Sequence, residues 1–128
     1  MAMDKPAQKI IPIYTSKGDV EAFLSYPYIF NRTGDWIGWV TPKREVYSVL
    51  GYYVGYITDD PRILRKRATS TLKPRLTPPA RPERIRLPAS VPLAPMMSEL
   101  TYSLVDVLME EAERLHTVET GEFRQDLD

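Results

Sequence analysis

The sequence predicts a mainly β protein. Three to four tandem β-hairpin repeats form a small barrel-like or radial module, followed by a proline-rich extended arm and one C-terminal α-helix. Three observations lead to this fold class. A motif of aromatic residues and glycine recurs every 16 to 17 residues in the first half of the chain. Seven of the 12 prolines fall between Pro74 and Pro95. One stretch near the C-terminus has apolar residues at helical spacing.

The repeat consists of three stretches that align without gaps. Each begins with a β-branched residue and an aromatic, has a glycine four residues after that aromatic, and ends on an aromatic–apolar pair. The stretches are IYTSKGDVEAFL (13–24), IFNRTGDWIGWV (29–40) and VYSVLGYYVGYI (46–57). β-Branched and aromatic residues favour strands, and the central glycine supplies the positive φ of a tight hairpin turn. Strands are therefore expected near 11–15, 20–24, 28–31, 36–40, 45–48, 53–57 and 62–66.

A fourth unit could begin at Ile63-Leu64, but Arg67 occupies the position of its glycine. The fourth unit is therefore incomplete or diverged. Small residues recur at one further repeat position, as Ala22, Gly38 and Gly55, which suggests close backbone packing between neighbouring hairpins. A single hairpin cannot bury its apolar face, so the units are expected to pack on one another around an axis.

This tandem pattern, above all IFNRTGDWIGWV, resembles the bacterial four-fold beta-flower proteins over roughly residues 10–66. The resemblance implies four hairpins arranged around an axis in a flower-like module. It brings no established activity and no catalytic residues that could be transferred to this chain.

The composition excludes several classes of protein. The 128 residues include 17 basic and 17 acidic side chains, one histidine and no cysteine. Disulfides, a thiolate nucleophile and cysteine-ligated metals are therefore excluded. No apolar run reaches the roughly 18 residues of a membrane-spanning helix, and no signal-peptide core follows Met1. A cytoplasmic location is the default expectation.

The zero net charge hides a segregation along the chain. Residues 62–97 carry 9 basic side chains and 1 acidic, whereas residues 98–128 carry 2 basic and 9 acidic. The remaining residues, 1–61, are nearly neutral. Segments of opposite charge and similar magnitude favour docking on each other, within the chain or between chains.

These shifts in composition divide the chain into four parts. They are a β-hairpin repeat domain (10–67), a basic proline-rich arm (68–97), an amphipathic acidic helix (98–116) and a tail (117–128). The prolines exclude a helix or central strand in the arm and favour extended polyproline-like chain. Apolar residues scattered along the arm indicate that it is docked and ordered.

The aromatics beside the glycines allow two interpretations. They form the core of the module, or some of them stack on a sugar, a base or a quaternary ammonium. Simple alternation along a strand places Trp36 on the face opposite Trp39 if no bulge intervenes. Trp36, Tyr52 and Tyr53 are therefore the candidates for surface rings.

The arm and helix supply the remaining candidate interaction residues. Arg62, Arg65 and Arg67 begin the basic stretch, which could attract phosphates. In SELTYSLVDVLMEEAERL (98–115), Leu100, Leu104 and Leu108 fall on one helical face. That face either packs on the β-module or binds a partner.

No motif for catalysis, a metal or a cofactor is present. His116 is the only histidine and has no nucleophilic or acidic partner in a motif. The glycines are spaced for hairpins rather than for a phosphate-binding loop. The preferred interpretation is a non-catalytic protein that acts in protein–protein interaction or assembly, with a protein partner or as a homo-oligomer. The alternative is a nucleic-acid or carbohydrate binding module that uses surface aromatics and the basic arm.

Overall fold

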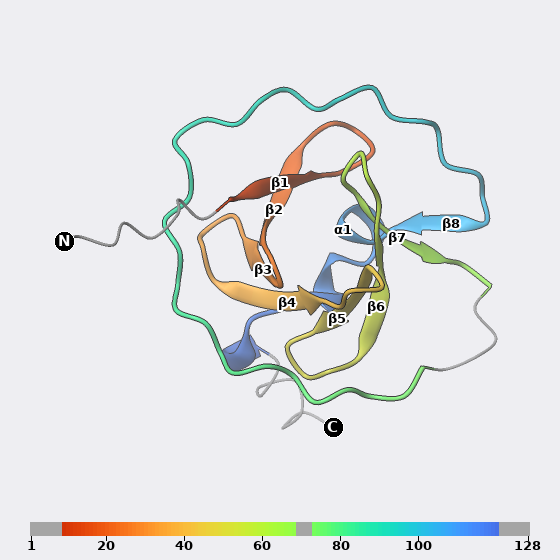
Figure 1. Cartoon of the computed structure of the whole chain (residues 1–128). Helices are drawn as coiled ribbons and strands as arrows, with labels where there is room; N and C mark the ends of the chain where they lie inside the picture. The colour runs from red at the N-terminus through yellow and green to blue at the C-terminus, as the bar shows by residue number, and fades with distance from the viewer. Residues whose placement is uncertain (1–8, 69–72, 121–128) are drawn as a thin grey trace.

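The strands follow the sequence repeat. The computed structural model describes residues 9–68 and 73–120. In this part of the chain, one antiparallel sheet contains eight strands in sequence order (Figure 1). They are β1 (Ile11–Tyr14), β2 (Val20–Ser25), β3 (Tyr28–Asn31), β4 (Trp36–Val40), β5 (Glu45–Ser48), β6 (Tyr53–Ile57), β7 (Ile63–Lys66) and β8 (Leu104–Asp106). The seven strands expected from the repeat are confirmed, and β8 is added to them.

The first three hairpins end in the same kind of turn, which we call a tip. The glycines at the tips have φ values in the left-handed region, as the repeat predicts: 89° at Gly18, 85° at Gly34 and 91° at Gly51. Three residues before each glycine stands a short polar side chain. Its oxygen accepts hydrogen bonds from the backbone N–H groups two and four residues further on, which fixes the turn; these residues are Thr15, Asn31 and Ser48.

The small residues inside the repeats lie opposite β-branched residues of the neighbouring strand. Ile29 pairs with Gly38, and Val46 pairs with Gly55. A Cβ atom built on Gly55 would lie 2.3 Å from the carbonyl oxygen of Leu64. The expected close backbone approach between hairpins is therefore confirmed, because no side chain fits at this position.

The fourth hairpin is completed by a strand far along the chain. In this hairpin β7 pairs with β8, with Leu64 opposite Asp106 and Lys66 opposite Leu104. The expected helix over 98–116 is wrong for most of its length, since only α1 (Val107–Glu110) and the 3₁₀ turn η1 (Ala112–Arg114) are helical. Residues 104–106 have a helical pattern, but pairing with the open edge of β7 gives them backbone hydrogen bonds that stabilise a strand more than this pattern stabilises a helix.

The connection between β7 and β8 encircles the module, and we call residues 73–100 the girdle (Figure 1). Its chain is extended, as the prolines predict. From Leu76 to Leu100 every third residue except Pro88 is half-buried, and three residues is the period of a polyproline helix with one face on the module. The half-buried residues in this register are Leu76, Pro79, Pro82, Ile85, Val91, Ala94, Met97 and Leu100. Pro78 and Leu87 are half-buried outside it.

The girdle contacts the three tips at intervals of nine residues. The Leu76 N–H donates to the Gly51 carbonyl oxygen at 2.9 Å, and the Ile85 N–H donates to the Gly34 carbonyl oxygen at 3.1 Å. Another nine residues on, Ala94 lies against Gly18, where a Cβ would be 3.6 Å from the Ala94 Cβ. Nine residues are three turns of polyproline helix, so the same face of the girdle meets each tip.

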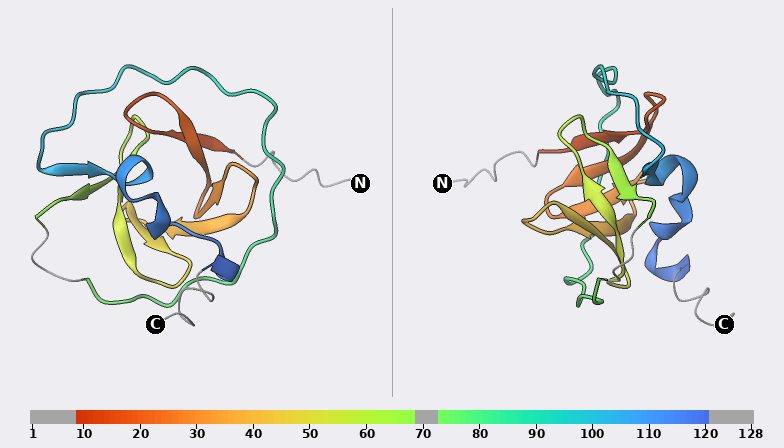
Figure 2. Two further views of the ribbon diagram at one scale, coloured as in Figure 1. Left: turned by 180° about the vertical axis from the view of Figure 1, so that it is seen from behind. Right: turned by 90° about the vertical axis from the view of Figure 1, so that its right-hand side faces the viewer.

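The core lies between the strands and is covered at one end by the C-terminal segment. Ile13, Ile29 and Val46, which begin the three repeats, are fully buried in it. Val107 of α1 and Leu115 join the same cluster, and Figure 2 shows α1 lying against one end of the module. Within residues 9–68 and 73–120, no helix has the length and apolar character needed to cross a bilayer.

Candidate interaction surface

Two of the candidate rings lie beside cationic side chains of the girdle, although Tyr52 is 52% exposed, as expected of a surface ring. The Arg75 guanidinium lies 5.1 Å from the ring centroid of Tyr52, and the Lys73 Nζ lies 5.1 Å from that of Tyr53. Lys73 also donates to Glu45 at 2.5 Å. The cations that these rings hold are therefore those of the chain itself, and the contacts fasten the girdle to the third hairpin.

Trp36 does not present a surface ring, so this expectation is wrong. Its side chain is 7% exposed, packs with Phe30 and Val49, and donates from Nε1 to the Gly38 carbonyl oxygen at 2.7 Å. The reason is a bulge: the register shifts where Phe30 pairs with Trp36. The shift places Trp36 on the side of Phe30, in a cluster that Ile85 of the girdle and Val118 pack against, while its neighbour Ile37 lies in the main core.

Arg62 is a buried link rather than a surface cation. It is 3% exposed, and its Nη2 donates to Asp60 at 2.7 Å. Its Nη1 donates to Ser16 Oγ at 3.0 Å and to the Ser98 carbonyl oxygen at 3.1 Å. Burial raises the pKa of Asp60, but hydrogen bonds from Arg62 and Thr58 outweigh it and hold this pKa below its usual value. One guanidinium thus joins the first tip, the β6–β7 turn and the end of the girdle.

Arg65 and Arg67 bind the acidic C-terminal segment. Arg65 donates twice to the Glu111 carboxylate, at 2.9 and 2.8 Å, in a bidentate pair. Arg67 lies 3.7 Å from Glu110, and its guanidinium is 4.5 Å from the ring centroid of Tyr102. The oppositely charged segments therefore dock on each other within one chain, which is one of the two arrangements expected from the charge segregation.

The Glu111 carboxylate makes stability depend on pH. The hydrogen bond from Arg65 lowers the pKa of Glu111, burial opposes this, and Arg114 lowers it further. A carboxyl whose pKa is lowered by folding adds stability above its ordinary pKa, and this is lost as pH falls through the folded pKa. We expect Glu111→Gln to lower the free energy of unfolding by about 1–2 kcal/mol at pH 7. Urea unfolding should show this difference shrinking between pH 5 and pH 3.

The matched control is Glu83→Gln, which changes an exposed carboxylate on the girdle. We expect this variant to remain within about 0.5 kcal/mol of the parent at every pH. A Glu111→Gln deficit that stays constant down to pH 3 would contradict the assigned ion pair.

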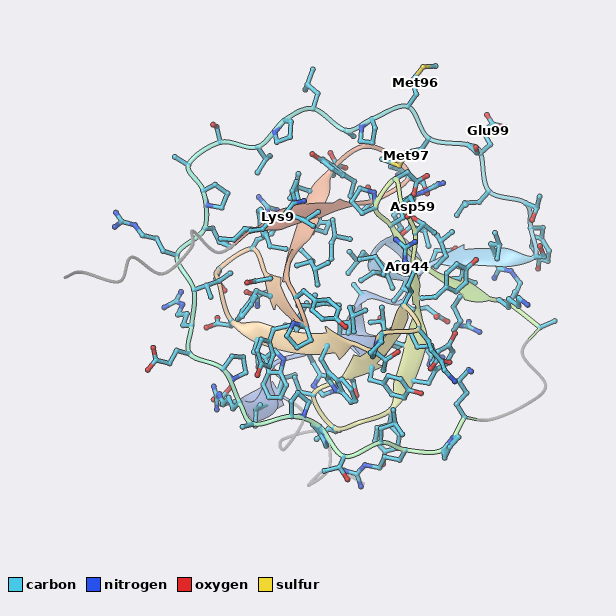
Figure 3. The ribbon with its side chains drawn as sticks, in the orientation of Figure 1. Lys9, Arg44, Asp59, Met96, Met97 and Glu99 are labelled. Carbon is cyan, nitrogen blue, oxygen red and sulfur yellow. The ribbon has the colours of Figure 1, made fainter. Side chains whose placement is uncertain are left out.

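A cavity of about 450 Å³ opens where the girdle returns to the sheet. Its walls are apolar side chains of the girdle end, β8 and α1, and its polar lining includes three carboxylates and one cation. We call this cavity and its rim the corner. The corner consists of Ser16, Arg67, Met97, Ser98, Glu99, Leu100, Thr101, Tyr102, Leu104, Asp106, Met109 and Glu110. Figure 3 shows Met96 pointing away from the module and Met97 pointing toward it on this stretch of the girdle.

The corner brings together three of the nine candidate residues, namely Arg67, Leu100 and Leu104. Leu108 lies apart from them and packs against the core cluster. The helical spacing that grouped Leu100, Leu104 and Leu108 does not exist in the structure, because Leu104 is in β8. Leu100 and Leu104 both line the corner because the girdle ends there and the chain enters the sheet as β8.

Comparison with known proteins agrees with this architecture. The model of the family described as 4-fold beta flower protein matches residues 11–104. The chain belongs to this family. The matched range starts with β1 and ends with the first residue of β8, so it includes the whole girdle of this beta flower. No curated protein and no solved structure matches the chain.

Sequence reasoning missed several residues of this beta flower's corner. Met97 could have been found from the sequence, because it belongs to a series of apolar residues that recur at every third position from Leu76 to Leu100. Ser16 and Asp106 carry no such signal, since they are 90 residues apart and meet only when β8 joins the sheet. In the part of the chain that the structure describes, no three His, Cys, Asp or Glu side chains gather in a way that could hold a metal ion.

Proposed function

We propose that this beta flower is a non-catalytic protein-binding subunit whose partner docks on the corner. The observation that carries the proposal is where large exposed apolar side chains gather. Six large apolar side chains of the described residues are exposed, and four of them lie within 17 residues of sequence: Leu93, Met96, Tyr102 and Met109, at 95%, 102%, 84% and 40%. Tyr102 and Met109 line the corner, Leu93 and Met96 precede it on the girdle, and the other two, Tyr26 and Tyr52, lie elsewhere. Exposed apolar residues grouped around a cavity are typical of interaction sites.

The lining of the corner suits binding better than chemistry. Met97 and Met109 have flexible, polarizable side chains that adapt to different contacts, and Tyr102 offers a large ring with a polar end. The carboxylates of Glu99 and Glu110 outnumber the one cation on the rim, Arg67. The docking segment of the partner is therefore apolar with a positive charge.

The contacts of the girdle give less support to the nucleic-acid alternative. Lys73, Arg75, Arg81 and Arg84 each contact a carboxylate or a carbonyl oxygen of the same chain. A basic strip whose cations are used in this way has fewer donors for phosphates. Tyr52 and Tyr53 are also occupied by girdle cations, so they offer less of a stacking platform.

Affinity capture from the native host tests the proposal with three forms of the full chain. The double variant Met96→Glu/Met109→Glu places one charge on Met109, which lines the corner, and one on Met96, which lies beside the corner on the girdle. We expect this variant to retain at most a tenth of the protein that the parent retains. Tyr26→Glu is the matched control, because Tyr26 is 59% exposed but lies in the β2–β3 turn. Equal retention by all three forms, or capture of nucleic acid in place of protein, would contradict docking on the corner.

A further inference from the structure

The turns between the repeats surround a second cavity, at the ends of the strands away from the tips. These turns join β2 to β3, β4 to β5, and β6 to β7, and in each of them a carbonyl oxygen accepts from a strand that the turn does not connect. The cavity has a volume of about 330 Å³, within the range of small-molecule sites, and such sites are frequent at the ends of β-barrels. We call this cavity the mouth. Six of its lining residues are apolar, namely Ile11, Leu24, Val40, Pro42, Ile57 and Pro61.

Arg44 lies at the mouth, at a turn position where the tips have glycine. The β4–β5 turn repeats the hydrogen bond of a tip, since the Arg44 N–H donates to the Thr41 carbonyl oxygen as the Gly18 N–H donates to that of Thr15. The φ of Arg44 is 67°, in the left-handed region that the tip glycines also occupy. This conformation costs free energy for any residue with a Cβ atom, and such strain is often retained where a side chain has a function.

The ion pair that Arg44 forms does not offset this cost. Its Nη1 lies 2.6 Å from Asp59 Oδ1, and the two side chains are 53% and 91% exposed. An ion pair between such exposed groups contributes little to stability, because water screens it and both side chains lose freedom. Folding alone therefore does not explain an arginine at this position, whereas an exposed guanidinium that lines the mouth is accessible to a ligand.

An apolar cavity with an arginine on its rim favours an anion that carries an apolar body. A guanidinium binds a carboxylate best through two parallel hydrogen bonds, and the contact with Asp59 uses one nitrogen. Asp59 also lines the mouth, so the rim carries one positive and one negative charge, which suits a monoanion better than a phosphate. Water fills about 30 Å³ per molecule and a methylene group is of similar size, so the mouth holds roughly ten non-hydrogen atoms.

We propose that the mouth binds a small monocarboxylate with an apolar body, of the class of medium-chain fatty acids. The carboxylate replaces Asp59 on the Arg44 guanidinium, and the apolar body lies between Leu24, Val40 and Ile57. Figure 3 labels the Arg44 and Asp59 side chains at this site. The mouth shares no lining residue with the corner, so this site is independent of the proposed docking of a partner.

Titrations of the full chain followed by NMR test the ligand class. The probes are octanoate, which matches the mouth in size, octylammonium and octanol, which keep the apolar stem without the anion, and acetate, which keeps the anion without the stem. We expect octanoate to give saturable shifts of the Arg44 amide and of the Ile11 and Ile57 methyl groups. Its affinity should be at least tenfold higher than that of each other probe. Equal affinity for octylammonium or octanol, or the absence of saturable shifts, overturns the proposal.

Arg44→Gly separates binding from folding, because glycine is the residue that the tips have at this position. We expect this variant to melt at or above the temperature of the parent and to bind octanoate at least tenfold more weakly. Lys43→Ala is the matched control, since it removes an exposed cation of the same turn that does not line the mouth, and its affinity should stay within twofold. Asp59→Asn removes the competing carboxylate and should raise the affinity at least twofold. Unchanged binding in Arg44→Gly, an equal loss in Lys43→Ala, or a loss in Asp59→Asn contradicts the assigned role of Arg44.

Discussion

Gly51→Ala is expected to detach the girdle from the third hairpin and to lower the free energy of unfolding by about 2–4 kcal/mol. Its φ of 91° is unfavourable for alanine, which accounts for about 1–3 kcal/mol. A Cβ at this position would also clash with the Leu76 carbonyl oxygen, so the girdle must move away and the hydrogen bond from the Leu76 N–H to Gly51 is lost as well. Chemical denaturation and the rate of trypsin cleavage after Arg75 measure the two effects.

The chain contains its own control for this experiment. Gly18 has the same φ, 89°, but a Cβ there makes only an ordinary 3.6 Å contact with Ala94. Gly18→Ala should therefore show the backbone penalty alone, with girdle cleavage at the parent rate. Gly34→Ala, where the Cβ would lie 2.3 Å from the Ile85 carbonyl oxygen, should behave like Gly51→Ala. Equal losses at Gly18 and Gly51, with unchanged cleavage, would show that the tips do not hold the girdle.

Arg62→Met is expected to lower the free energy of unfolding by about 2–4 kcal/mol, because it leaves the half-buried Asp60 carboxylate without its ion pair and removes the donors of two further oxygens. Asp60 would lose its ion pair, and the Ser16 hydroxyl and the Ser98 carbonyl oxygen would lose a donor. That loss is a large part of the roughly 5–15 kcal/mol that stabilises a domain of this size. Thermal and urea unfolding at pH 7 provide the measurement.

Arg86→Met is the matched control, since Arg86 is exposed on the girdle, and it should change stability by less than about 0.5 kcal/mol. The stability loss of Arg62→Lys should lie between those of Arg62→Met and Arg86→Met. An ammonium keeps the positive charge but lacks the two guanidinium nitrogens that reach Asp60 and Ser16 together. A Met variant as stable as the parent would mean that Arg62 only fills space.

The sequence repeat predicts most of the β-module because its signals are local. Strand-forming dipeptides such as Ile29-Phe30 and a glycine at a fixed spacing specify a hairpin without reference to the rest of the chain. The direction of Trp36 was not predictable in this way, since it depends on a bulge that appears only when β3 and β4 pair. Alternation along one strand does not contain that information.

β8 and the corner depend on contacts across the whole chain. Residues 98–115 have a helical pattern, and only the unpaired edge of β7 converts Leu104–Asp106 into a strand. The register of the girdle, in contrast, could have been found. Arg75-Leu76 and Arg84-Ile85 are nine residues apart, and each pair places its apolar residue on a tip glycine and donates from its arginine to the preceding carbonyl oxygen.

The insertion of the girdle between β7 and β8 has a consequence during protein synthesis. The partner of β7 leaves the ribosome only after roughly 40 further residues, which takes about 2–8 s at ordinary elongation rates. Through this interval β7 is an unpaired edge strand, and such edges recruit other chains. Arg65, Lys66 and Arg67 place three positive charges at this edge. These charges disfavour pairing of β7 with another chain until β8 and the carboxylates of Glu110 and Glu111 follow.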